Sequence, residues 1–162
     1  MQNNKNITSL LFFFFSSFIF CTNIIGVNLE EHKYGLNVYK KGNCMGCHSW
    51  DGKGGGHGAA VSLRNTELTI NDIINVIKCG RPGTGMPYFL KKAYKEEKCY
   101  DTTFEDYDEF NRPVNSQKFL SSKQIEAVSI FVREVLQNKK LDRNYCEYFY
   151  EKGSKACLNL KN

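Results

Sequence analysis

The sequence predicts an all-α protein with few helices. Three stretches of the 162-residue chain carry apolar residues at helical spacing between residues that favour helix ends, namely 29–41, 69–79 and 121–137. No stretch alternates apolar and polar residues in the manner of a half-buried strand, so strands are expected to be few. The length suits one domain.

The first two helices have recognisable ends. The first runs over residues 29–41 and stops at Gly42. The second begins after Thr69, whose hydroxyl can cap the helix, and Asp72 is placed to complete a capping box. Gly80 is a stop signal for this second helix. We therefore expect an irregular segment between the two helices.

The last helix carries an apolar stripe. Either Ser121 or Ser122 caps its N-terminus, and it ends near Gln137. The stripe is made of four residues at helical spacing, Ile125, Val128, Val132 and Val135. Before this helix, residues 94–115 interleave charges with aromatic residues and break the periodicity. This segment is predicted to be an inserted surface loop whose charges are solvated, with a partner-docking epitope as the alternative.

The run Cys44-Met45-Gly46-Cys47-His48 carries the chemistry of the chain. The spacing C-x-x-C-H suits two thioether bonds to one edge of a porphyrin, with the following histidine placed as an axial ligand of the iron. We therefore predict one covalent haem c, attached to Cys44 and Cys47 and ligated by His48. A redox dithiol, or a zinc site completed by His57, is the alternative.

Met86 is the expected second axial ligand. Met1 is the initiator and Met45 lies inside the attachment motif, which leaves Met86 between Gly85 and Pro87. A thioether favours ferrous iron and raises the reduction potential. His57 is the rival ligand, and bis-histidine ligation would lower the potential.

Other residues near the motif are candidates for supporting roles. The second ring nitrogen of His48 should donate to a backbone carbonyl, and Pro82 lies where such a carbonyl is often supplied. Arg64 and Arg81 are candidates for contacts with the haem propionates, or are surface charges. The glycine-rich run over residues 52–58 is either a flexible surface loop or packing for a bulky group.

Four of the seven cysteines are left for disulfides. Cys21 lies in the N-terminal segment, and the haem motif takes two more. We prefer the pairs Cys79–Cys99 and Cys146–Cys157 because each pair brackets a local segment, although the residues allow three pairings. The first bridge would brace the segment that carries Met86, or serve general stability.

The N-terminus predicts export. Lys5 precedes an apolar run over residues 10–20, which is too short for a comfortable membrane span. We divide the chain into a signal peptide at 1–26, the main domain at 27–141 and a C-terminal extension at 142–162. The expected location is the periplasm, with no membrane span in the mature form. An uncleaved anchor, or a lipid on Cys21, is the alternative.

The charge excludes one class of partner. The formal net charge of +5 falls to +4 once residues 1–26 are removed, and the basic residues are not patterned as in nucleic-acid-binding proteins. A mildly basic protein of this kind can instead be steered electrostatically to acidic protein surfaces.

From residue 35 to residue 136 the chain resembles the class I c-type cytochromes. The resemblance rests on the haem motif, on Gly85-Met86-Pro87 and on the apolar pattern of the last helix. In that family the first and last helices cross at a glycine and paired aromatic residues, and Gly35, Tyr39 and Phe131 match these positions. The resemblance implies helices wrapped around one haem, here with an inserted loop and a disulfide-bearing tail.

The resemblance also implies a function. It implies a periplasmic one-electron carrier, not an enzyme, that works between a dehydrogenase or respiratory complex and a terminal acceptor. Its partners would be transient redox proteins, without a small-molecule substrate. The alternative is a haem subunit bound stably to a periplasmic dehydrogenase complex. Residues 79–87 look like a bacterial subgroup, some of whose members accept electrons from quinoprotein alcohol dehydrogenases. A third hypothesis is an enzyme or gas sensor with an open haem site.

Overall fold

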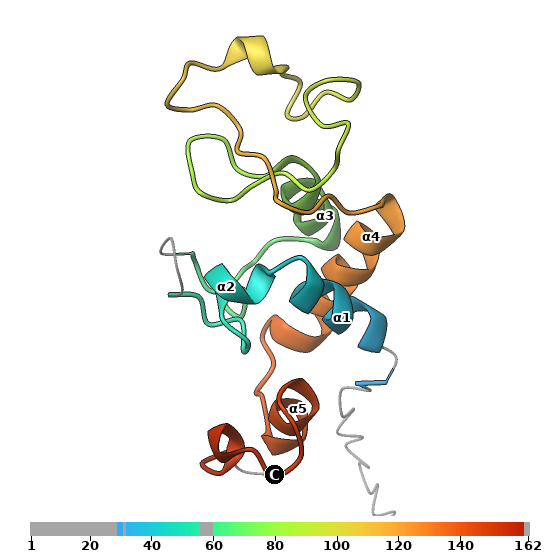
Figure 1. Cartoon of the computed structure of the whole chain (residues 1–162), viewed down its shortest axis with the longest axis vertical. Helices are drawn as coiled ribbons and strands as arrows, with labels where there is room; N and C mark the ends of the chain where they lie inside the picture. The colour runs from blue at the N-terminus through green and yellow to red at the C-terminus, as the bar shows by residue number, and fades with distance from the viewer. Residues whose placement is uncertain (1–28, 31, 56–59, 161–162) are drawn as a thin grey trace, which may run out of the picture.

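The computed structural model describes residues 29–30, 32–55 and 60–160. The predicted signal peptide and His57 lie outside these residues. The described residues contain the following helices (Figure 1): α1 Lys33–Lys41, α2 Cys44–His48, α3 Ile70–Cys79, η1 Phe104–Asp106, α4 Ser122–Phe131, η2 Val132–Leu136, α5 Arg143–Phe149 and η3 Lys155–Cys157. These residues form isolated β-bridges and no strand, which confirms the all-α prediction.

The predicted helix caps are present. The Thr69 hydroxyl accepts a hydrogen bond from the backbone N–H of Asp72, whose carboxylate accepts one from the N–H of Thr69. Ser121 and Gln124 form the same capping box at the start of α4, so Ser121 rather than Ser122 is the cap. α1 begins at Lys33 instead of Leu29, because the preceding residues form turns and no side chain caps the helix earlier.

Helices α1 and α4 cross in direct contact at Gly35. A Cβ atom on Gly35 would lie 2.4 Å from the carbonyl oxygen of Ala127 and 2.6 Å from the Cβ of Phe131. Next to this crossing the rings of Tyr39 and Phe131 lie with their centroids 5.5 Å apart, and both side chains are fully buried. The glycine therefore permits the close approach that the family resemblance implied.

Beyond α4 the helix continues as the π-helix η2, which ends at Leu136, next to the predicted end near Gln137. Val132, Val135 and Leu136 are buried in the core. The Gln137 side-chain amide, 2 % exposed, donates hydrogen bonds to the carbonyls of Thr66 and Leu68. This contact fastens the end of the helix to the loop that precedes α3.

The insert between α3 and α4 is a largely exposed loop, as predicted, but some of its aromatic residues pack into the core of the protein. The ring of Tyr94, 2 % exposed, lies 5.3 Å from that of Phe104 and 5.8 Å from that of Tyr107. Tyr88 contacts the same cluster. The charged residues of the insert remain at the surface. The aromatic residues are spaced along the insert, so they can be buried while the charged residues between them stay exposed.

The C-terminal tail folds back onto the main domain through α5. Tyr145 and Phe149 on α5 flank the single tryptophan, Trp50, with ring centroids 5.8 Å and 5.9 Å from it. The Lys40 ammonium donates to the carbonyl of Phe149 at 2.7 Å and lies over its ring. In Figure 1 the tail lies at one end of the long axis and η1 lies at the other.

Both preferred disulfides are present. The structure joins Cys79 to Cys99 and Cys146 to Cys157. Within the part of the chain that the structure describes, no helix has the length and apolar character needed to cross a membrane.

Candidate functional site

The C-x-x-C-H motif forms the short helix α2. Residues three apart on a helix share one face, so both thiols are presented together. Cys44 and Cys47 are the free cysteines among the described residues, since the other four are in disulfides. Burial raises the pKa of the Cys44 thiol to about 12, so the unmodified side chain is neutral at neutral pH.

The imidazole of His48 is buried and held by a backbone carbonyl, but not the expected one. Its Nδ1 lies 3.1 Å from the carbonyl oxygen of Val61, which can only accept, so Nδ1 carries the proton. The expectation for Pro82 was therefore wrong. With Nδ1 engaged, Nε2 is the ring nitrogen that is left to bind a metal.

Val61 reaches His48 because the glycine-rich segment folds back on itself. The N–H of Gly54 donates to the carbonyl of His48 at 2.9 Å, and the N–H of Gly55 donates to the carbonyl of Ala60 at 3.0 Å. Gly54 has a φ of +80°, and a Cβ there would lie 2.3 Å from the Ala60 oxygen. The described glycines thus close a tight loop that delivers the Val61 carbonyl.

Electrostatics keep His48 in the neutral form. Burial lowers the pKa of His48 below its usual value, and the positive charge of Arg81 lowers it further, while the hydrogen bond to Val61 acts in the opposite direction. A neutral imidazole is the form that binds a metal.

Met86 lies in a loop that is tied to the end of α3. The N–H of Arg81 donates to the carbonyl of Met86 at 3.0 Å, and the N–H of Met86 donates to the Thr84 hydroxyl at 3.2 Å. The backbone from Met86 to Tyr88 packs directly against Gly80, which has a φ of +68°. A Cβ on Gly80 would lie 2.7 Å from the Met86 carbonyl oxygen, so no other residue fits there. The Met86 side chain is partly buried against the core.

Two tyrosines of the insert form hydrogen bonds with the end of α3, where the Met86 loop begins. The Tyr100 hydroxyl donates to the carbonyl of Gly80 at 2.8 Å, and the Tyr94 hydroxyl donates to the carbonyl of Cys79 at 2.8 Å. With the Cys79–Cys99 bridge they fix the residues from which the Met86 loop starts. Sequence reasoning missed both tyrosines, and their only signal was their nearness to Cys99 along the chain.

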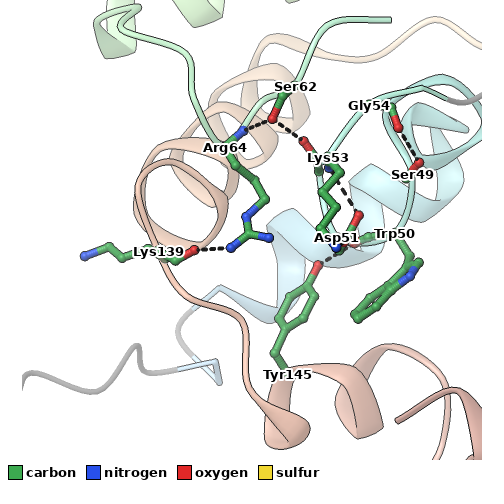
Figure 2. A network of polar contacts seen from close by, with 10 residues as sticks. Ser49, Trp50, Asp51, Lys53, Gly54, Ser62, Arg64, Lys139 and Tyr145 are labelled. Carbon is green, nitrogen blue, oxygen red and sulfur yellow. Dashed lines mark hydrogen bonds and ion pairs between the residues drawn. The ribbon is translucent and has the colours of Figure 1, made fainter. Parts of the chain in front are cut away.

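Arg64 joins two segments of the chain. Its guanidinium donates to the carbonyl of Lys139 at 2.8 Å, and its own carbonyl accepts from the N–H of Asn138. Figure 2 shows the side chain extended towards Lys139, beyond the end of η2. Arg64 thus has a structural contact, and propionate contacts of Arg64 and Arg81 stay predictions.

The backbone that follows His48 is held by two buried tyrosines. The Tyr39 hydroxyl donates to the carbonyl of Ser49 at 2.7 Å, and the Tyr145 hydroxyl donates to that of Trp50 at 2.9 Å, as Figure 2 shows for Tyr145. Asp51, 7 % exposed, follows and forms an ion pair with Lys53 at 3.2 Å. The tail thereby fixes the backbone next to the motif.

The donor set fits a covalent haem better than a zinc ion. Two free thiols three residues apart, followed by a neutral histidine whose Nδ1 is already engaged, match the needs of thioether attachment and axial ligation. Among the residues that the structure describes, no group of three or more histidine, cysteine, aspartate or glutamate side chains is placed to hold a metal ion. The zinc alternative also includes His57, which lies outside the described residues, so that alternative stays untested.

Residues 30–102 match the family model described as cytochrome c oxidase, cbb3-type, subunit III. This range includes the C-x-x-C-H motif, Met86 and both cysteines of the first disulfide. No curated protein and no solved structure matches the chain.

Proposed function

We propose, on the premise that residues 30–102 carry the domain of a class I c-type cytochrome, that this protein is a periplasmic one-electron carrier with one covalent haem c. Domains of this kind bind haem and transfer electrons. The observation that carries the proposal is the His48 imidazole, with Nδ1 bound to the Val61 carbonyl, beside two free thiols.

Each residue of the site has a defined task in this proposal. Cys44 and Cys47 would hold the haem through thioether bonds, and His48 and Met86 would be the ligands of its iron. The haem supplies an iron that takes up and releases one electron. The protein's own work is to keep both ligands in place as the charge of the site changes, so that little rearrangement accompanies electron transfer.

The contacts around both ligands suit that task. The Val61 carbonyl fixes the orientation of the His48 ring, and the Arg81 N–H holds the carbonyl of Met86. The disulfide at Cys79 and the Tyr100 hydroxyl brace the start of the Met86 loop. A site filled by two protein ligands has no position for oxygen or a substrate, so we propose a carrier rather than an enzyme or gas sensor.

The haem is tested on protein matured by a haem-attachment system. Mass spectrometry should show one covalently added haem on the native chain, and a pyridine haemochrome spectrum should identify it as haem c. The variant Cys44→Ala/Cys47→Ala should carry none. Native protein without a covalent haem would refute the proposal.

The axial ligand is tested by Met86→Leu, which keeps most of the volume and removes the sulfur donor. It should abolish the methionine–iron absorption band, lower the reduction potential and permit rapid carbon monoxide binding. Met45→Leu, a matched change within α2, should leave all three properties unchanged. An unchanged spectrum in the Met86 variant would exclude Met86 as a ligand.

Location and partners are further parts of the proposal. Domains of this family are typically exported, which agrees with a signal peptide over residues 1–26. Cell fractionation and the N-terminal mass of the mature protein test this. The donor would be a dehydrogenase or respiratory complex, and the recipient a terminal acceptor.

A second candidate function is that of a haem subunit in a stable complex, either of an oxidase or of a periplasmic dehydrogenase. The name of the matching family model, an oxidase subunit, favours it. Native electrophoresis of gently lysed cells with haem staining separates the candidates. A free carrier migrates at its own mass, whereas a subunit migrates with the complex.

A further inference from the structure

Phe110 is the most exposed of the large apolar side chains that the structure describes, at 92 %. It is nevertheless held in a defined position. The Asp108 carboxylate accepts hydrogen bonds from the N–H groups of Phe110 and Asn111, each at 2.9 Å, and from the Asn111 side-chain amide. An ordered turn thus presents an aromatic ring to solvent, and such rings are enriched in the centres of protein interfaces.

The turn lies against the loop that carries Met86. The N–H of Gly83 donates to the carbonyl of Asn111 at 3.1 Å, and the N–H of Tyr88 donates to that of Val114 at 3.0 Å. Met86 lies between these two contacts along the chain. Residues 83–85 are exposed there. A partner seated on Phe110 would therefore contact the part of the surface nearest the proposed ligand loop.

The segment that precedes Phe110 has a charge opposite to that of the whole protein, and one basic residue, Arg112, follows Phe110 in the turn. Residues 101–109 contain five carboxylates and no lysine or arginine, in a chain of net charge +5. All five side chains lie at or near the surface, at Asp101, Glu105, Asp106, Asp108 and Glu109. This acidic segment, with η1 at its centre, lies at the end of the molecule remote from α5 (Figure 1).

We propose that Phe110 and the acidic segment 101–109 form a docking surface for a redox protein with a basic rim around an apolar pocket. The pocket would receive the Phe110 ring, and the basic rim would face the five carboxylates. Opposite charges would steer the partner to this end, away from the basic remainder of the chain. The inference rests on the proposed electron-carrier function and names the chemistry of its partner.

The test measures electron transfer to a probe that has the chemistry proposed for the partner. Tris(phenanthroline)cobalt(III) is a cation with aromatic faces, and it takes one electron from the reduced protein to become cobalt(II). Stopped-flow absorbance gives the second-order rate at several ionic strengths. Phe110→Ala should lower the rate about threefold, the scale of one lost aromatic contact. Glu105→Lys/Glu109→Lys should lower it about tenfold at low salt and less at high salt.

Matched variants control for general effects. Leu158→Ala removes a 59 % exposed apolar side chain from the tail. Glu126→Lys/Glu134→Lys makes the same charge change on α4 and η2, where both side chains are exposed. Leu158→Ala should change the rate less than Phe110→Ala does. The charge change on α4 and η2 should change it less than Glu105→Lys/Glu109→Lys does. The same series is repeated with a basic mitochondrial cytochrome c as oxidant, and with ferricyanide as an anion whose rate the Glu105 and Glu109 changes should raise.

The outcomes separate this inference from the proposed function. Absence of haem from the native protein overturns both. If the native protein has a normal haem spectrum, but Phe110→Ala and Glu105→Lys/Glu109→Lys transfer electrons as fast as their control variants, the docking surface alone is overturned. Sedimentation is measured in parallel. A dimer of the native protein that Phe110→Ala converts to monomer assigns the surface to a second copy of the chain, which also overturns the proposal.

Discussion

The Nδ1 atom of His48 lies 3.1 Å from the carbonyl oxygen of Val61, thirteen residues further along the chain. This contact selects the tautomer of the ring and its orientation. It exists because the loop between the two residues closes on itself at Gly54, whose N–H donates to the His48 carbonyl. The orientation of the His48 ring thus depends on a residue outside the C-x-x-C-H motif.

The role of Gly54 in closing the loop can be tested by comparing Gly54→Ala with the same change at Gly55. Gly54→Ala and Gly55→Ala both place a side chain at a positive φ, which costs about 1–2 kcal/mol. Only the former also clashes, because its Cβ would lie 2.3 Å from the Ala60 oxygen, whereas the Gly55 position is open. Gly54→Ala should therefore lower the free energy of unfolding more, and also the yield of attached haem. Equal effects in urea titrations and haem assays would contradict this role.

The brace from Tyr100 to Gly80 should act on the Met86 loop. Tyr100→Phe removes the hydrogen bond to the Gly80 carbonyl, with an expected cost of about 1 kcal/mol. The methionine–iron band should disappear at lower urea concentration than in the native protein, and the reduction potential should fall. Tyr107→Phe is the matched control, because its hydroxyl bonds to Thr102 inside the insert. A larger effect of the control on the band would refute the brace.

The Cys146–Cys157 disulfide should stabilise the contact between the C-terminal tail and Trp50. Cys146→Ser/Cys157→Ser removes a bridge across 11 residues, which costs about 3 kcal/mol in chain-entropy terms. The tail should then separate from Trp50 at lower denaturant concentration than the α1–α4 core unfolds. Because Trp50 is the only tryptophan, its emission reports this step directly, and circular dichroism reports the core. Coincident transitions by both probes would contradict a separable tail.

Buried tyrosines should make the protein sensitive to alkali. Burial raises the pKa of Tyr39 well above its usual value, and the same holds for Tyr145. The unfolded chain therefore loses these protons first, so stability is complete below pH about 10 and falls as the pH rises further. Urea unfolding at pH about 7 and about 11 measures the loss. Tyr39→Phe should reduce the loss, although it costs the hydrogen bond to Ser49 at neutral pH.

The control for the alkaline measurement is Tyr34→Phe, because Tyr34 is 47 % exposed on the outer side of α1. It should leave the pH dependence as it is in the native protein. If the Tyr39 variant loses as much stability as the native protein between the two pH values, ionisation of Tyr39 is not the cause.

Much of the local structure could be predicted from the sequence. The box at Thr69 was recognisable because the cap and its partner lie three residues apart, whereas for α4 the sequence left the cap open between Ser121 and Ser122. The disulfide between Cys146 and Cys157 followed from their nearness along the chain. The tight crossing at Gly35 was accessible through the resemblance to a family, since nothing in the residues around it names Phe131 as its neighbour.

Other features were outside the reach of pattern reasoning. The aromatic residues of the insert alternate with charges, so their sequence resembles a solvated loop, yet Tyr94 is buried. The carbonyl that holds His48 was assigned to Pro82, whereas Val61 supplies it. Every residue has a carbonyl, so composition cannot identify which one reaches a given ring.

By itself the sequence determined the chemistry that depends on short spacing: the thiols and imidazole of α2, the helix ends and the preferred cysteine pairs. The tertiary structure alone decided which distant groups support that chemistry, namely Val61 behind His48, Tyr100 on Gly80 and Tyr145 on Trp50. The physical reason is that a cap or an attachment motif is satisfied within one helical turn. A backbone carbonyl meets its distant donor only after the helices have packed.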